Sequence, residues 1–113
     1  MSSVVNVLGT DYTVTLDKRK NLTHLSKDNM GECRVYSKEL ACLRSKENDC
    51  TEEERDERAC EIVAHEIFHA FVNESGLCVD DDIEEMFAYW YMKVWRKMNN
   101  AILQVLDENG LLD

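Results

Sequence analysis

The chain has 113 residues, of which 13 are Lys or Arg and 23 are Asp or Glu, so its formal net charge is −10. A chain of this length builds one core and has no room for a separate cofactor domain, which excludes large two-domain enzymes. No apolar run approaches the roughly 18 residues of a membrane span, and the N-terminal residues lack the segments of a secretion signal. We therefore expect a single domain over residues 1–113, cytoplasmic and without membrane contact.

The acidic excess lies entirely in the second half of the chain. Residues 1–50 carry 8 basic and 7 acidic side chains, whereas residues 51–113 carry 5 basic and 16 acidic ones. Proteins that bind nucleic acids neutralise phosphates with Lys and Arg, and the basic cluster Lys18-Arg19-Lys20 is short enough to be a solvated turn. The composition therefore argues against a nucleic-acid partner.

The five cysteines are odd in number and contain no C-x-x-C pair. Without a secretion signal, this favours reduced thiols in a cytosolic compartment. The alternative is a structural zinc site built from Cys33, Cys42 and Cys50, but their spacings match no common zinc finger or ribbon.

The first half of the chain predicts a small sheet. Residues 4–8 and 12–16 are rich in β-branched side chains, and a short turn containing glycine joins them, which predicts a β-hairpin. The polar stretch 17–31 predicts a loop with one helical turn. Two further short strands are expected at 33–36 and 39–43, so we expect an antiparallel sheet of three or four strands.

A long helix is expected to begin after Thr51. Thr51 and Glu54 form a capping box, in which each side chain satisfies a free backbone N–H group of the other residue. Apolar residues then recur at steps of three and four up to Ser75-Gly76, where the glycine provides a left-handed stop.

A second helix is expected after the three aspartates at 80–82, which cap its start and match the positive end of its dipole. Its apolar stripe is expected to pack against the first helix, and it consists of Ile83, Met86, Phe87, Trp90, Tyr91, Val94 and Met98. Asn99-Asn100 is expected to interrupt this helix before a short last element at 101–106. The resulting fold class is α+β, with residues 1–50 mainly strands and loop and residues 51–113 mainly helical.

Residues 65–69, His-Glu-Ile-Phe-His, form an HExxH motif inside the first predicted helix. Positions four apart lie one above the other on a helix, so His65 and His69 can bind one zinc ion. Glu66 lies one step round the helix, where it can accept a proton from a water molecule as a general base. The motif therefore predicts a catalytic Zn²⁺ site.

A catalytic zinc site usually has three protein ligands and one open position. Glu84 and Glu85 are the candidates for the third ligand, because the turn at Ser75-Gly76 folds the second helix back across the first. A helical wheel places Glu84 nearer to the apolar stripe and so slightly favours Glu84. Each glutamate also follows an aspartate by three residues, in a capping pattern that has a purely structural role.

The motif with its continuation to Leu77, together with Glu84-Glu85-Met86-Phe87-Ala88-Tyr89-Trp90, resembles small phage and prophage-encoded zinc metallopeptidase-like proteins of the gluzincin-like class. The resemblance implies a minimal zincin-like domain that acts in a bacterial host cell if the chain is phage-encoded. It also implies a zinc ion held by both histidines and a downstream glutamate, with Glu66 as base and acid in peptide-bond hydrolysis.

The resemblance does not decide the third ligand. Several gluzincin-like families have a small residue three positions after the ligand, which matches Glu85 with Ala88. Where relatives have an acidic residue four positions after the ligand to orient a histidine, this chain has Ala88 or Tyr89. Both glutamates therefore remain candidates.

A peptide substrate is expected to lie extended along an edge strand, for which residues 39–43 are the candidate, with Tyr36 and His24 as candidate oxyanion donors. The alternative function is a non-catalytic, zinc-stabilised interaction module that binds or inhibits a host protein, since so small a domain leaves little space for substrate subsites. Off the apolar stripe, the side chains of Tyr89, Met92 and Trp95 indicate a surface for self-association or for a partner.

Overall fold

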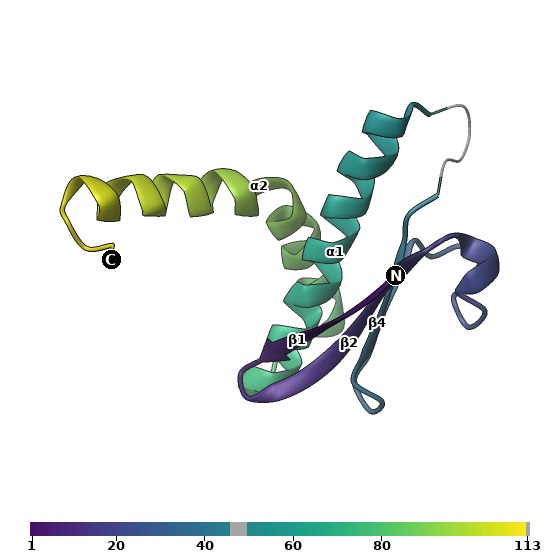
Figure 1. Ribbon diagram of the computed structural model, residues 1–113. Coiled ribbons are helices and arrows are strands. Elements are labelled where there is room, and N and C mark those ends of the chain that lie inside the picture. The colour runs from purple at the N-terminus through teal and green to yellow at the C-terminus, as the bar shows by residue number, and fades with distance from the viewer. Residues whose placement is uncertain (46–49, 113) are drawn as a thin grey trace.

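The computed structural model describes residues 1–45 and 50–112, which form a four-stranded sheet followed by two helices (Figure 1). This is the α+β class that the sequence predicts. In chain order, the elements are β1 (Ser2–Val7), β2 (Thr10–Asp17), the short 3₁₀ helix η1 (Arg19–Asn21), β3 (Gly31–Arg34), β4 (Glu39–Leu43), α1 (Glu52–Ser75) and α2 (Asp81–Glu108).

The sheet is mixed, so the expectation of an antiparallel sheet is wrong. Its strand order is β1-β2-β4-β3, with antiparallel pairs at both sides and a parallel pair between β2 and β4. The loop after β2 carries β3 past β4 to the outside, and β4 then returns between β2 and β3. Leu40, Ala41, Cys42 and Leu43 are all buried, as a continuous apolar run requires in an interior strand.

This strand order also overturns the expected substrate edge. Residues 39–43 form β4, which is paired on both sides, and the edges of the sheet are β1 and β3. An extended peptide cannot add to a strand that already has two neighbours, because its backbone donors and acceptors are occupied. The edge beside α1's HExxH motif is β3.

The helices form two further layers on the sheet. α1 packs on one face of the sheet, and α2 packs on α1 (Figure 1). The core between sheet and α1 is formed by buried apolar residues of both, among them Val7, Tyr12, Leu40, Ile62 and Ala70.

Both predicted ends of α1 are confirmed. The Thr51 hydroxyl accepts a hydrogen bond from the Glu54 backbone N–H at 3.1 Å, and the Glu54 carboxylate accepts one from the Thr51 N–H at 3.3 Å. At the other end, Gly76 has a φ of 74°, which a side chain would disfavour. The motif residues therefore lie in the interior of a well-bounded helix.

A hydrogen-bonded cluster fastens the C-terminal end of α1 to the sheet. The Tyr12 hydroxyl, on β2, donates to the Glu74 carboxylate at 2.6 Å, and Lys38 Nζ lies 2.9 Å from the same oxygen. The hydrogen bond from Tyr12, with those from Lys38 and Thr10, lowers the pKa of Glu74 to about 2. The Glu74 carboxylate is therefore held in its ionised form.

We expect this cluster to make the free energy of unfolding depend on pH in the acid range. The pKa of Glu74 is lower in the folded chain than its ordinary value of 4.5, so its contribution is complete above about pH 4.5 and is lost as the pH falls toward 2. In thermal unfolding, the melting temperature of Glu74→Gln should therefore fall less steeply than that of wild type as the pH is lowered from 6 to 2. Glu57→Gln, an exposed change on the same helix, should retain the wild-type slope; equal slopes in all three proteins would contradict the assignment.

α2 differs from its prediction in two ways. It runs without a break through Asn99-Asn100, since both side chains are exposed and asparagine only weakly disfavours a helix interior. Most of its apolar stripe faces away from α1, since Phe87 is 48% and Trp90 53% exposed, and Ala88 is the one buried residue of the helix. Within the stripe, the Tyr91 ring does pack on Phe68 of α1, with 5.3 Å between ring centroids. The face with Ala88 contacts α1, and Glu84 and Glu85, which contact the histidines of α1, lie on the same side of α2.

No helix in the described part of the chain combines the length and apolar character needed to cross a membrane.

Candidate metal centre

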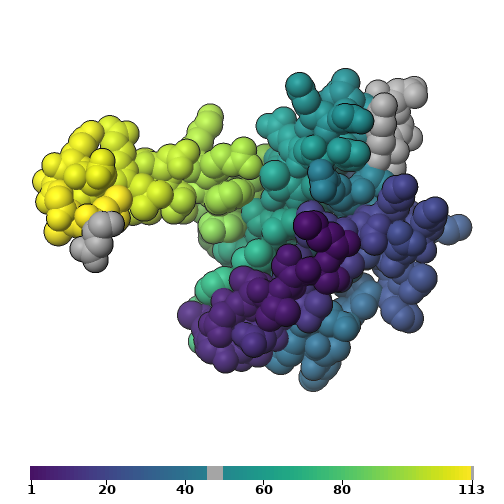
Figure 2. All heavy atoms as spheres, viewed as in Figure 1, coloured from purple at the N-terminus to yellow at the C-terminus, as the bar shows by residue number. Residues whose placement is uncertain are grey.

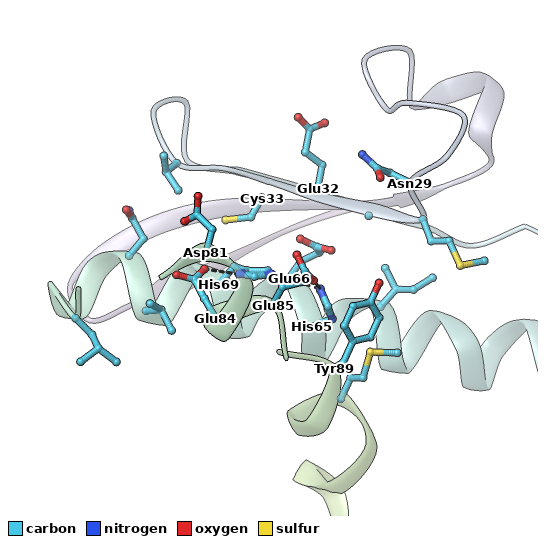
Figure 3. Close-up of a pocket in the computed structure, with 18 of the residues that line it drawn as sticks. Asn29, Glu32, Cys33, His65, Glu66, His69, Asp81, Glu84, Glu85 and Tyr89 are labelled. Carbon is cyan, nitrogen blue, oxygen red and sulfur yellow. Dashed lines mark hydrogen bonds and ion pairs between the residues drawn. The ribbon is translucent and has the colours of Figure 1, made fainter. Parts of the chain in front are cut away.

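Three ligand-type atoms converge between α1 and α2. His69 Nε2 lies 3.3 Å from His65 Nε2 and 3.5 Å from Glu85 Oε1, and that oxygen also contacts His65 Nε2. The two histidines are one helical turn apart on α1, and Glu85 comes from the first turns of α2 (Figure 3). The HExxH motif and one of the two candidate glutamates are therefore brought together.

The geometry fits a metal ion. Two imidazole nitrogens bound to one tetrahedral zinc, each at about 2.0–2.1 Å, lie roughly 3.3–3.4 Å apart. The separation of the two Nε2 atoms is 3.3 Å. Two imidazoles and one carboxylate are also a donor set that suits zinc, and three protein ligands leave a fourth position open. His65, His69 and Glu85 can therefore hold a divalent ion.

The neighbouring glutamate has a different place. Glu84 Oε2 lies 2.5 Å from His69 Nδ1, on the side of the ring away from His65. A histidine that binds a metal through one nitrogen commonly donates its other N–H to a carboxylate, which fixes the orientation of the ring. The structure thus separates the two candidates: Glu85 Oε1 lies with the two Nε2 atoms that could bind a metal, and Glu84 contacts the Nδ1 side of the His69 ring.

His65 is held mainly by packing. Its Nδ1 atom is buried and has no hydrogen-bond partner within residues 1–45 and 50–112. The ring packs edge-on against Tyr89, with 4.6 Å between ring centroids. Burial lowers the pKa of His65, which favours the neutral imidazole that binds metals. Tyr89 is not among the site residues predicted from the sequence. Its position four residues after Glu85 could have indicated it, because residues four apart lie on the same face of a helix.

Glu66 is buried next to this cluster, with 7% of its surface exposed. Burial is the main cause that raises the pKa of Glu66 to about 7; the nearby His69 opposes this rise, and the carboxylates of Glu85 and Glu32 add to it. A carboxyl with a pKa near neutrality can both accept and release a proton under physiological conditions. Its environment is therefore suited to a general acid–base role.

Space for the Glu66 carboxylate is provided by a glycine that sequence reasoning missed. A Cβ atom at Gly31, the first residue of β3, would lie 2.7 Å from Glu66 Oε2 and 2.8 Å from Ile62 Cγ2. Nothing in the local sequence distinguishes this glycine from an ordinary loop glycine. Its role depends on how β3 approaches α1, which only the tertiary structure reveals.

A cavity of about 780 Å³ opens over the cluster, between β3, α1 and the start of α2. Its lining is rich in carboxylates and contains no Lys or Arg from the described residues; besides the motif it includes Asn29, Cys33, Asn73, Asp81 and Tyr89. Neither His24 nor Tyr36 lines it, and Tyr36 is 99% exposed. Both are therefore wrong as oxyanion donors at this site.

The alternative zinc site on cysteines is not formed. Within the described residues, His65, His69 and Glu85 are the one group of potential metal ligands that converges. Burial raises the pKa values of Cys33 and Cys42 to about 12, which disfavours the thiolates that bind metals. All five cysteines are free thiols.

Comparisons of the chain with protein-family models, with curated proteins and with solved structures find no match. The fold and the site therefore define the chain as an α+β domain with a four-stranded mixed sheet. This domain brings two histidines and a glutamate together beneath an open cavity.

Proposed function

We propose that this protein is a zinc-dependent peptidase of the gluzincin-like class that its motif resembles. The observation that supports this most directly is the convergence of His65 Nε2, His69 Nε2 and Glu85 Oε1 beside the buried carboxylate of Glu66. A structural zinc site needs no buried general base, whereas hydrolysis does. The five free thiols favour a reducing compartment, the cytoplasm.

His65, His69 and Glu85 would hold the zinc ion, which supplies a Lewis acid for the scissile carbonyl and lowers the pKa of water toward about 7. Glu66 accepts the proton of the attacking water and later delivers it to the leaving amine. Burial raises its pKa to about 7 in the metal-free chain, and a cation bound nearby would favour the ionised carboxylate that accepts the proton. Glu84 keeps the His69 ring in its ligand orientation through Nδ1.

Tyr89 is the residue best suited to donate a hydrogen bond to the substrate carbonyl oxygen. Its ring stands beside His65, and its hydroxyl points toward the side of the cavity that β3 forms (Figure 3). A cavity lined by carboxylates and lacking Lys and Arg among the described residues has few other groups that stabilise developing negative charge. Tyr89 therefore takes the role that was expected of Tyr36 or His24.

The substrate would lie along β3, since this strand borders the cavity and pairs with β4 on one side alone. An extended peptide can add to such an edge through backbone hydrogen bonds. This would bring a peptide bond across the cavity above Glu66 and next to Gly31.

The alternative, a non-catalytic zinc-stabilised interaction module, is favoured by a different observation, the exposed apolar surface of α2. Metal content and peptide cleavage distinguish the two. We expect one zinc ion per chain by elemental analysis, cleavage of peptides from a mixed library, loss of cleavage with a chelator and recovery on adding zinc. Bound zinc without cleavage would favour the module, and a chain that binds no zinc would contradict both.

A further inference from the structure

The cavity over the metal centre is lined by charge of one sign. No Lys or Arg of the described residues lines it, whereas six of its lining residues are Asp or Glu: Asp28, Glu32, Glu66, Asp81, Glu84 and Glu85. A divalent ion would offset only part of this charge. A cleft lined by one sign of charge concentrates ligands of the opposite sign, most strongly between apolar walls, and Ile62, Val72 and Leu77 provide such walls here. The cavity therefore favours a positively charged ligand.

Basic side chains from neighbouring segments are held elsewhere. Lys38 Nζ lies 2.9 Å from the Glu74 carboxylate, and the Arg34 guanidinium lies 3.1 Å from the Glu32 carboxylate. The Arg19 guanidinium donates to two backbone carbonyl groups of the loop before β3. The C-terminal part of α2, which carries further basic residues, projects away from the sheet and α1 (Figure 2). Apart from Glu32, the carboxylates of the cavity are therefore not neutralised by Lys or Arg within the described part of the chain.

The Glu66 carboxylate faces this cavity from inside the protein (Figure 3). Glu66 is 7% exposed, and within residues 1–45 and 50–112 its carboxylate forms neither a hydrogen bond nor an ion pair. A buried carboxylate in this situation is costly unless a ligand donates hydrogen bonds to it or brings positive charge close to it. Glu66 therefore indicates, independently of the other carboxylates, that the cavity accommodates a ligand of this kind.

The other carboxylates do not form a second metal site. Among the described residues, His65, His69 and Glu85 are the one group whose ligand atoms converge on a single point. Asp28 lies in the loop before β3, and Asp81 begins α2. Charges distributed along a cavity in this way match a ligand that also distributes its charges, such as an extended peptide with side chains about 7 Å apart on each face.

Asp81 is placed to contact a side chain close to the scissile bond. It precedes Glu85 by four residues, so both lie on the same face of α2, about 6 Å apart along the helix axis. This distance corresponds to roughly two residues of an extended peptide. The Asp81 carboxylate points from the start of α2 toward Cys33 of β3 (Figure 3), and it has no side-chain partner among the described residues.

We propose that the substrates of this site are basic peptide segments, in which a Lys or Arg side chain one or two residues from the scissile bond forms an ion pair with Asp81. This inference rests on the proposed peptidase function and names its substrate class. Asp81 determines specificity, while the metal ligands and Glu66 carry out the reaction. The remaining negative charge of the cavity attracts the peptide as a whole and disfavours acidic segments.

Cleavage of matched peptides tests the specificity. The peptides carry Lys, Gln or Glu in turn at each of the positions next to the scissile bond, and kcat/KM is measured for each. At the selected position, wild type should prefer Lys over Gln by about 5- to 10-fold at low salt, and by less at high salt. Asp81→Asn should abolish this preference, and Asp81→Lys should prefer Glu. Equal cleavage of the three peptides by wild type, or an unchanged preference in Asp81→Asn, would overturn the proposal.

Asp82→Asn is the matched control, because Asp82 neighbours Asp81 and is exposed but does not line the cavity. It should keep the wild-type preference for Lys. If it weakens the preference as much as Asp81→Asn does, the attraction is a general effect of the acidic surface and the assignment of Asp81 is wrong.

Binding measured apart from cleavage distinguishes failure of this proposal from failure of the peptidase. Zinc-loaded Glu66→Gln protein is titrated into fluorescently labelled peptides rich in Lys or in Glu, and anisotropy reports the affinity. The basic peptide should bind about 5- to 10-fold more tightly, and adding Asp81→Asn should remove most of this difference. Selective binding without cleavage by wild type would support the charge selection and contradict the peptidase. Cleavage by wild type without charge selection would overturn this proposal and leave the peptidase intact.

Discussion

Replacing Glu85 by Gln is expected to lower zinc affinity by roughly 1,000-fold, whereas the same change at Glu84 should lower it by about 10- to 100-fold. Glutamine retains the shape of glutamate but is a poor metal ligand, so the difference measures the loss of a ligand oxygen. Glu85 Oε1 contacts both Nε2 atoms, and Glu84 contacts Nδ1 of His69 alone. Competition titration against a chromophoric zinc chelator measures both affinities.

Asp82→Asn is the matched control for this pair. Asp82 is exposed on the same first turn of α2, and its loss removes one negative charge without touching either histidine. It should therefore reduce zinc affinity only by the long-range electrostatic contribution, a factor of a few. If Glu84→Gln were as damaging as Glu85→Gln, Glu84 would be a ligand, and the division of roles between the two glutamates would be wrong.

The two glutamates also show where sequence reasoning reaches its limit. The histidine pair and Glu66 are predicted from local geometry, because a helix fixes the relation between positions four apart. A third ligand would have to come from another helix, and which glutamate can approach the histidines depends on which face of α2 contacts α1. The helical wheel assumed that the stripe through Phe87 and Val94 is buried, but the contact is made around Ala88, which rotates the helix and brings Glu85 to the site.

The strand order has a similar origin. The hairpin of β1 and β2 is local, and the turn at Leu8-Gly9, with φ values of 51° and 95°, is of the kind that a two-residue connection requires. The parallel pairing of β2 with β4 joins segments separated by the whole of β3 and its preceding loop. The residue pattern within β2 or β4 does not indicate which other strand each one pairs with. Sequence alone therefore does not reveal that residues 39–43 form an interior strand and that β3 is the edge strand beside α1.

Glu66→Gln is expected to reduce peptide cleavage by about 10²- to 10⁴-fold and to leave zinc content unchanged. Glu66 contributes no atom to the converging ligand group, so its loss should not alter metal affinity as that of Glu85 does. Initial cleavage rates and elemental analysis on the same preparations separate the two effects. Loss of both activity and zinc would contradict the role of Glu66 as a base, as would full retention of activity.

The same substitution should stabilise the metal-free protein above neutral pH. Burial raises the pKa of Glu66 from 4.5 to about 7 in the folded chain, so folding favours the protonated form, and stability falls as the pH rises from about 4.5 through 7. The difference is on the order of 3 kcal/mol at pH 8. Thermal unfolding of chelator-treated protein should therefore show a higher melting temperature for Glu66→Gln than for wild type at pH 8, and a much smaller difference at pH 4.5.

Gly31→Ala provides the complementary change, because it retains the Glu66 carboxylate and disturbs its position. The added methyl group would lie 2.7 Å from Glu66 Oε2 and 2.8 Å from Ile62 Cγ2, so either β3 or the carboxylate must shift. Activity should fall, since a displaced base no longer reaches the attacking water, while zinc content is retained. If Gly31→Ala is active and Glu66→Gln is inactive, cleavage does not require the Glu66 carboxylate to stay in its present position. The close approach of β3 to Glu66 would then contribute to packing alone.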